Sequence, residues 1–148
     1  ANCFCSDGET PYDTANERGT PQGCYHVAES AAVFVAADDN CKRESGFVAT
    51  AHDTDKNYFL MSLFKKNSNF WLGYQRTNGA FTWEDNSKNP FTAWAAGNPV
   101  SNQDCAYGKQ TTGFNSAWYS AGCRDSITAS HQYACQLRPC DSTYNCWV

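Results

Sequence analysis

The spacing of apolar residues predicts two helices in the first half of the chain. Between residues 28 and 43, apolar side chains recur near the helical period, and Gly46 ends the run. Cys41 falls on the apolar face of this segment, so we expect its side chain to be buried. The second helix is expected over residues 53–66, where Asp53 offers an N-cap and an apolar stripe follows it.

In the second half of the chain the pattern changes to short aromatic strands. Strands are expected over residues 70–75 and 81–83, and the tripeptide Thr77-Asn78-Gly79 between them is typical of a hairpin turn. Further strands are expected over residues 117–120 and 132–137.

Residues 86–115 are predicted to form a long loop. They are mostly Asn, Gly, Ser, Thr and Pro, and Trp94, Cys105 and Tyr107 are the main exceptions. A segment of this length without regular structure is unusual inside a compact domain and is often functional. Residues 1–23 are polar and rich in turn signals, so we expect an irregular N-terminal arm that cysteine ties down.

The composition narrows the class of protein. The 148 residues fit one domain, and aromatic residues form 15% of them against a single methionine, which predicts a core of large rings. The net charge of −4 argues against nucleic acid as a partner, because phosphate binding needs clustered Lys and Arg. No apolar stretch approaches the roughly 20 residues that span a bilayer. We find no catalytic constellation and no Gly-x-Ser-x-Gly motif, so no enzyme is expected.

Nine cysteines indicate a secreted protein with disulfide bonds. No two Cys-x2-Cys units face each other, and no histidine has a cysteine or second histidine at a metal-like spacing. We therefore expect neither a zinc site nor a cofactor. Because nine is odd, one cysteine is free or bonded between chains, and a disulfide-linked homodimer is one candidate assembly.

Six short segments occur in the order and approximate spacing of one known family. They are Gly23-Cys24-Tyr25, Trp71-Leu72-Gly73-Tyr74, Phe81-Thr82-Trp83-Glu84-Asp85, Trp94-Ala95-Ala96-Gly97, Trp118 followed by Cys123, and Tyr133-Ala134-Cys135-Gln136. On these segments, which span about three quarters of the chain, it resembles a C-type lectin-like domain. The resemblance implies an α+β fold in which two helices flank small antiparallel sheets, with a long loop and disulfide staples. Trp71, Trp83, Trp94 and Trp118 fall on positions that the family uses for its core.

We interpret residues 1–148 as a single domain of this kind. Residues 1–23 would be an N-terminal arm tethered by a disulfide, and residues 138–148 an extra tail that contains cysteine. That tail resembles those of secreted lectin-like proteins of invertebrates.

The resemblance also implies a disulfide pairing. The three implied bridges are Cys41–Cys135, Cys105–Cys123 and Cys5–Cys24. The first would clamp the first helix to the last strand, and the second would staple the base of the long loop. The cysteines left over are Cys3, Cys140 and Cys146. Either the two C-terminal cysteines pair locally and leave Cys3, or Cys3 bonds one of them.

The loop departs from the calcium motif of the sugar-binding members. Those members use a Glu-Pro-Asn or Gln-Pro-Asp triplet, an acidic residue two places before the loop cysteine, and Asn-Asp after the tryptophan. This chain has Asn98-Pro99-Val100, Gln103 and Tyr119-Ser120 at those positions. Arg76 stands where an auxiliary site would need aspartate. Because calcium prefers about six to eight oxygens, several of them anionic, the resemblance implies no metal site here.

The polar residues of the loop are the best candidates for ligand contact. Amide and hydroxyl groups can bond sugar hydroxyls or a protein backbone without a metal. The candidates are Asn98, Ser101, Asn102, Gln103 and Asp104. The same groups could instead hydrogen-bond the loop to itself.

Our leading hypothesis is a secreted recognition module that binds a protein or a multivalent glycan independently of calcium. The alternative is a structural or assembly protein that forms a covalent dimer through its odd cysteine. A calcium-dependent carbohydrate-binding lectin is the least favoured of the three.

Overall fold

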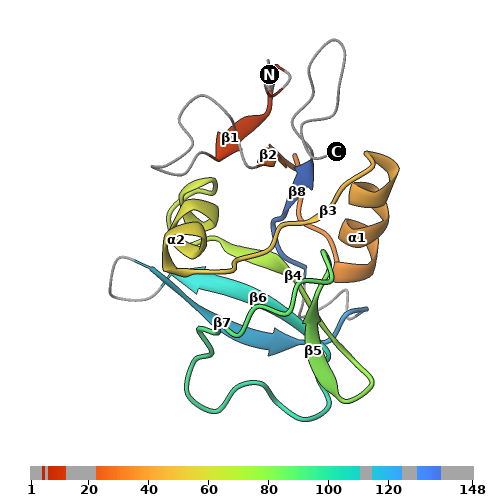
Figure 1. Cartoon of the computed structure of the whole chain (residues 1–148), viewed down its shortest axis with the longest axis vertical. Coiled ribbons are helices and arrows are strands. Elements are labelled where there is room, and N and C mark those ends of the chain that lie inside the picture. Colours follow the sequence, from red (N-terminus) through yellow and green to blue (C-terminus); the bar gives the residue numbers. More distant parts are fainter. Residues whose placement is uncertain (1–4, 6, 13–22, 111–114, 125–129, 138–148) are drawn as a thin grey trace.

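The computed structural model describes residues 5, 7–12, 23–110, 115–124 and 130–137. Its strands are β1 (Thr10–Tyr12), β2 (Gly23–Val27), β3 (Phe47–Val48), β4 (Asn69–Thr77), β5 (Ala80–Trp83), β6 (Cys105–Gln110), β7 (Ser116–Ala121) and β8 (Ala134–Leu137). They form two antiparallel sheets with the strand orders β1-β2-β8-β3 and β5-β4-β6-β7. Two helices flank β3 and β8, and the second sheet lies beneath them (Figure 1). The predicted α+β fold is confirmed.

The first helix, α1 (Phe34–Arg43), starts later than the sequence pattern predicts. The expected start at residue 28 is wrong because residues 28–32 run alongside another part of the chain. Ala28 N–H donates to the Tyr133 carbonyl at 3.0 Å, and Ala32 N–H donates to the His131 carbonyl at 3.0 Å. Small apolar residues suit this extended contact as well as they suit a helix, so their spacing misplaced the boundary.

The second helix, α2 (Thr54–Ser62), begins where the sequence predicts and ends four residues before the predicted end. Asp53 is its N-cap, with Oδ1 accepting the Lys56 N–H at 2.7 Å. The helix ends at Ser62, and Asn67 then adopts a left-handed conformation with φ of 69°. Phe64 lies beyond the helix but still packs on the core, where its ring stacks on Phe70 at 5.1 Å.

Two predictions of irregular structure are wrong. β6 lies inside the stretch expected to be a loop, and it is a central strand of the second sheet, between β4 and β7. Its Gly108 is needed there, because an added Cβ would lie 2.5 Å from the Phe70 ring. β1 lies inside the N-terminal arm and pairs with β2. Both strands depend on pairing with other segments, β1 with β2 and β6 with β4 and β7, and their own residues carry little apolar alternation.

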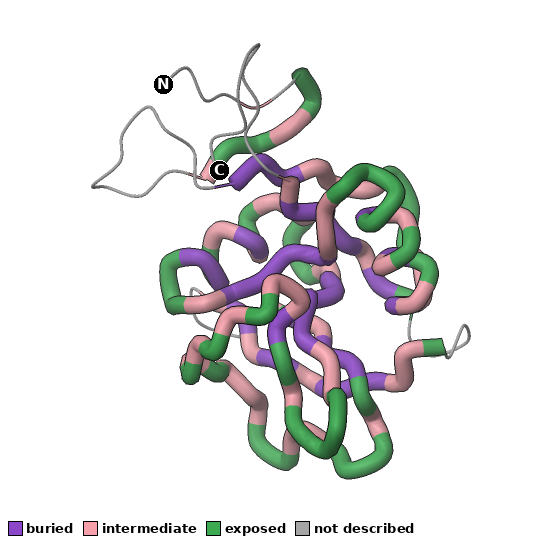
Figure 2. Tube along the Cα trace, turned by 45° about the vertical axis from the view of Figure 1, so that its right-hand side comes forward, coloured by how far each residue is buried: buried purple, intermediate pink, exposed green. Residues whose placement is uncertain are grey.

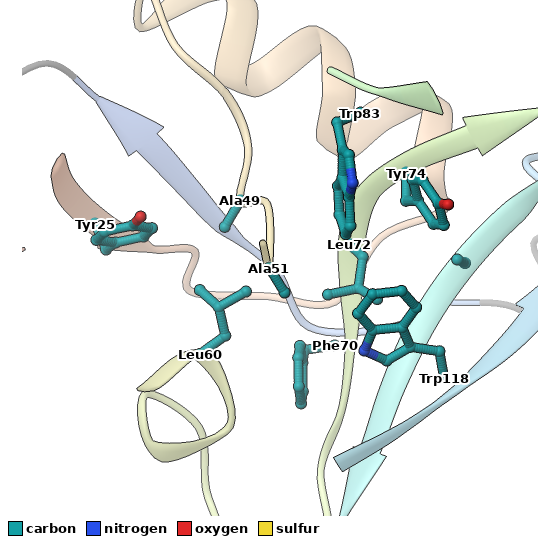
Figure 3. Packing of buried hydrophobic residues seen from close by; sticks show 10 residues of the cluster. Tyr25, Ala49, Ala51, Leu60, Phe70, Leu72, Tyr74, Trp83 and Trp118 are labelled. Atoms are coloured by element: carbon teal, nitrogen blue, oxygen red, sulfur yellow. The ribbon is translucent and has the colours of Figure 1, made fainter. Parts of the chain in front are cut away.

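The tryptophans form much of the core, as predicted. Trp71, Trp83 and Trp118 are at most 2% exposed, whereas Trp94 is half-buried and packs against their cluster. Figure 3 shows the rings of Trp83, Tyr74 and Trp118 grouped at the second sheet, with Leu60 of α2 among the residues that complete the cluster. Buried residues lie mostly in the interior of the molecule, and the tips of the loops are exposed (Figure 2).

Three disulfides join the same cysteines that the resemblance implied. The Cα atoms are 5.2 Å apart in Cys41–Cys135, 5.3 Å in Cys105–Cys123 and 5.5 Å in Cys5–Cys24. In the chain-entropy picture, the bridge between α1 and β8 stabilises by about 4–5 kcal/mol because its loop is long. Cys3, Cys140, Cys146 and the tail 138–148 lie outside the described residues.

Candidate functional site

The long loop between β5 and β6 is fastened at its middle to the edge strand β7. Ala95 N–H donates to the Trp118 carbonyl at 2.9 Å, and Trp118 N–H donates to the Ala93 carbonyl at 2.8 Å. The Asn98–Pro99 peptide that follows is cis. The loop lies at the end of the molecule opposite β1 (Figure 1). It therefore projects from the second sheet with a defined path along β7.

Ser120 of β7 gathers three residues of the loop. Its N–H donates to Asn98 Oδ1 at 3.1 Å, and its Oγ lies 2.9 Å from Gln103 Oε1 and 3.3 Å from Asn98 Oδ1. The same Oγ accepts the Val100 N–H at 2.7 Å. A hydroxyl has one proton, so it donates to one of the two amide oxygens at a time. The side-chain oxygens of Asn98 and Gln103 are thus committed to β7.

Arg76 of β4 holds the other side of the loop. Its Nε donates to Asp104 Oδ1 at 3.0 Å, and its Nη2 donates to the carbonyls of Val100 at 3.1 Å and Gln103 at 3.3 Å. The guanidinium carbon also lies 4.8 Å from the centre of the Phe81 ring. One planar cation therefore binds three oxygens of the loop and packs against a ring.

The structure divides the predicted contact residues into two groups. Asn98 and Gln103 are half-buried and face β7. Ser101 and Asn102 are exposed, and their side chains form no hydrogen bond within the described part of the chain. The Asp104 side chain is 56% exposed although it pairs with Arg76. Only the second group, Ser101 and Asn102 with Asp104 beside them, is placed to meet a ligand.

Sequence reasoning passed over one feature of this surface. Val100 is 42% exposed and is one of two large hydrophobic residues that reach this exposure among the described residues. Its N–H and carbonyl are both bound, by Ser120 and Arg76 respectively, so its side chain is presented from a fixed backbone. The sequence feature that could have drawn attention to Val100 is its place in the triplet Asn98-Pro99-Val100, which corresponds to the calcium triplet of the family.

The residues present do not fit a calcium ion. A hard cation needs several oxygens, some of them anionic, with free lone pairs directed at one point. Here the amide oxygens of Asn98 and Gln103 accept hydrogen bonds from Ser120, and the Asp104 carboxylate is neutralised by Arg76. Val100 contributes methyl groups in place of a ligand oxygen.

A Ser–His–Asp contact lies elsewhere, near the start of α2. Ser87 Oγ lies 2.9 Å from His52 Nε2, and Asp85 Oδ2 lies 3.0 Å from the same nitrogen. A catalytic triad needs the acid on one ring nitrogen and the hydroxyl on the other. Burial acts to raise the pKa of Asp85, but hydrogen bonds from His52 and Ser87 outweigh it and hold that pKa well below its usual range. These contacts fix the turn after β5 and do not assemble a nucleophile.

Lys56 of α2 is buried, although no local sequence pattern predicts it. It is 7% exposed, and its Nζ donates to Thr50 Oγ1 at 2.8 Å and Gln136 Oε1 at 2.9 Å. Burial lowers the pKa of Lys56 to about 8. The amine lines a cavity of about 180 Å³ together with the side chains of Tyr12, Tyr25, His52, Asp53 and Gln136.

Within the described residues, one group of side chains has its potential ligand atoms close enough together to hold a metal ion: Cys5, Glu9 and Cys24. The two cysteines are joined in a disulfide, so they offer no thiolate to a metal. No helix in the described part of the chain is long and apolar enough to cross a membrane.

Comparison with known proteins identifies the family. The family model for the lectin C-type domain matches residues 30–136. The chain therefore belongs to the C-type lectin domain family. It is 26% identical over 132 residues to E-selectin of Bos taurus, which covers 82% of this chain and 27% of that protein. It is 27% identical over 126 residues to the low affinity immunoglobulin epsilon Fc receptor of Mus musculus, covering 81% of this chain and 36% of the receptor.

The solved structures agree on the fold. A calcium-independent type II antifreeze protein superposes with a TM-score of 0.75 at 20% identity, covering 93% of this chain and 97% of that one. The C-type lectin domain of murine dendritic cell inhibitory receptor 2, in complex with an N-glycan, gives 0.72 at 18% identity, covering 90% and 98%. At these identities the likeness shows the fold alone. The chain spans about a quarter to a third of the length of the two curated relatives named above.

Proposed function

We propose that this domain is a secreted, non-enzymatic recognition module whose long-loop face binds a protein or a multivalent glycan without calcium. The observation that carries the proposal is the bonding of Ser120. In binding Asn98 and Gln103, it occupies the amide oxygens that stand at the calcium positions of the family motif. The loop can then keep its shape by hydrogen bonds alone.

The nature of the free surface supports contact with an extended partner. Ser101 and Asn102 offer hydroxyl and amide groups, and Val100 offers an exposed methyl surface beside them. Neutral hydrogen bonds are weak next to a metal-coordinated hydroxyl pair, so a single sugar would bind poorly. A protein surface, or a glycan presented in many copies, gains from several contacts at once.

Secretion is part of the proposal and rests on the disulfides. Three bridges among the described residues suit an oxidising compartment. Solved structures with this fold include a C-type lectin domain in complex with an N-glycan and a calcium-independent type II antifreeze protein. The fold therefore supports glycan binding in one protein and a calcium-independent activity in another.

A glycan array, read with calcium and again with EDTA, tests the proposal directly. We expect the same set of signals under both conditions. The double variant Ser101→Ala/Asn102→Ala should lose those signals and keep the melting temperature of the wild type, because these exposed side chains form no hydrogen bond with the residues that the structure describes. Lys88→Ala is the matched control, because Lys88 is an exposed residue of the same β5–β6 connection and follows Ser87, which contacts His52.

Signals that vanish in EDTA would contradict calcium independence, and signals that survive the double variant would move the site elsewhere. If the array shows no signal, the wild type and the double variant should be compared for binding to panels of immobilised extracellular proteins.

The odd cysteine count keeps a second function open, a covalent dimer with a structural or assembly role. The cysteines concerned lie outside the described residues. Non-reducing electrophoresis separates the two functions, since the dimer would run at twice the mass and collapse on reduction.

A further inference from the structure

Arg76 is the one cation that binds residues 97–104 within the described part of the chain. Val100 and Gln103 form the two ends of a turn that is also closed by a hydrogen bond from Gln103 N–H to the Val100 carbonyl at 3.1 Å. Nη2 of Arg76 binds the carbonyls at both ends. The two residues between those ends are Ser101 and Asn102, which are exposed.

We propose that Arg76 is the built-in cation of this loop, a positioning residue that orders the turn at residues 100–103 and presents Ser101 and Asn102 to a ligand. It takes the ordering role that a bound calcium ion would otherwise have, and it does so permanently. This inference rests on the proposed function, because it assigns a role within the same binding face.

The guanidinium group is suited to this role by its shape. Its N–H groups form a planar fork, so one side chain can bind Asp104 through Nε and two carbonyls through Nη2. A lysine ammonium could not reach the same three oxygens from one plane. The Phe81 ring supports the group at 4.8 Å. The Arg76 side chain is only 23% exposed, so water screens its contacts less than those of a surface pair.

A turn ordered in advance changes the energetics of recognition. A flexible loop loses conformational freedom when a ligand binds, and that loss weakens the affinity. With both ends of the turn held by Arg76, this loss occurs on folding. Removing Arg76 should therefore weaken binding even though its contacts are all within the protein.

Backbone amide exchange measured by NMR tests the proposal without any ligand. The reporters are the Val100 and Gln103 amides, and the reference is the Trp118 amide, which binds the Ala93 carbonyl. In Arg76→Gln we expect the two reporters to exchange roughly tenfold faster or more, because charge-assisted hydrogen bonds are lost, while Trp118 is unchanged. Arg76→Lys should behave like Arg76→Gln, and millimolar calcium chloride should slow exchange in neither variant.

Lys109→Gln is the matched control, since it removes an exposed cation from the neighbouring strand β6. If Arg76→Gln also speeds exchange of the Trp118 amide, the variant Asp104→Asn provides the test. It removes one hydrogen-bond partner of the guanidinium and should still speed exchange of the Val100 and Gln103 amides without affecting Trp118.

Unchanged reporter exchange in both Arg76→Gln and Asp104→Asn would overturn the proposal. So would a wild-type loop whose exchange slows when calcium is added. A failed glycan or protein screen would count against the proposed function and leave these exchange results as they stand.

Discussion

The indole nitrogen of Trp118 donates a hydrogen bond of 3.0 Å to Oδ1 of Asn57. The same oxygen accepts the Ser116 hydroxyl at 2.9 Å, and Asn57 Nδ2 donates to the Ser116 carbonyl at 3.0 Å. Asn57 is 1% exposed, so a buried amide on α2 satisfies three polar groups of β7. This contact fixes the helix against the strand that carries Ser120.

Asn57→Ala should destabilise the fold by about 2–4 kcal/mol, because it leaves buried donors and an acceptor on β7 without partners. Urea unfolding of the oxidised protein measures the change. Tyr58→Ala, an exposed neighbour on α2, should cost less than about 1 kcal/mol and serves as the control. Equal costs for the two variants would mean that the buried network is unimportant.

The tryptophans should differ in their contribution to stability. Trp71→Ala should cost about 3–5 kcal/mol, as the loss of a large core aromatic does. Trp71 is 1% exposed, and its Nε1 also donates to the Ala32 carbonyl at 2.7 Å. Trp94→Ala should cost less because Trp94 is half-buried. Chemical denaturation of both variants gives the ranking, and a larger cost at Trp94 would refute it.

The buried Lys56 should make stability rise in alkaline solution. Its pKa is lowered by burial to about 8 in the folded protein, below the ordinary value of 10.5 that applies on unfolding. Between these values the unfolded chain holds a proton that the folded chain has released, so stability increases with pH. The gain should reach about 2 kcal/mol from about pH 8 to about pH 10.

Lys56→Met should lack this gain. Tyrosine side chains also ionise near pH 10, so the difference in stability between wild type and variant isolates the contribution of Lys56. The unfolding midpoint in urea is the measurement, with free thiol alkylated beforehand to prevent disulfide exchange. Parallel pH profiles for the two proteins would show that Lys56 titrates normally in the fold.

His131 should also make stability rise with pH, but in the acid range. It is 9% exposed, and its ring lies 4.1 Å from that of Tyr107 and 4.7 Å from that of Trp71. Burial lowers its pKa from 6.5 to about 4. Its stabilisation is complete above about pH 6.5 and is lost as the pH falls towards about 4, because the unfolded state takes up the proton first.

His131→Phe should remove this part of the acid sensitivity, which we expect to be about 2–3 kcal/mol. Phenylalanine preserves the ring packing, and the backbone contact with Ala32 needs no side chain. Thermal melts across the acid range should therefore separate the two proteins. Melting curves that fall together would argue that His131 is free to protonate in the native state.

Calcium should leave the stability of the domain unchanged. Melting temperatures in millimolar calcium and in EDTA should coincide, because Ser120 and Arg76 already occupy the oxygens of the loop. A tight ligand of the folded state at a hundredfold excess over its Kd would add about 2.7 kcal/mol, which melting detects easily. A calcium-dependent shift of that size would mean that the loop rearranges to bind the ion.

Much of the architecture followed from the sequence. The periodicity that placed Cys41 on a buried helical face, and the aromatic strands around Trp71 and Trp83, are local signals that survive in the fold. Asp53 capped the second helix as its residue type predicts. The resemblance to the C-type lectin-like family implied three disulfide bridges, and the structure forms the same three.

The misplaced elements depend on pairing partners that lie outside their own segments. β6 contains Gly108 and lies within a stretch rich in turn-forming residues, yet it becomes a central strand because β4 and β7 supply its hydrogen bonds on both sides. The segment 28–32 is not helical, because Ala28 and Ala32 instead form backbone hydrogen bonds with Tyr133 and His131. A local pattern carries no information about a strand that arrives a hundred residues later.

The candidate site shows the same division. The sequence by itself determined that the loop is polar. The family resemblance added that Val100 stands in place of a ligand residue and Arg76 in place of an auxiliary-site aspartate. Only the tertiary structure decided that Asn98 and Gln103 turn inward to Ser120 while Ser101 and Asn102 stay exposed. The reason is that β7 approaches one side of the loop and β4 the other, and the amide groups that lose contact with water there must find hydrogen-bond partners in the protein.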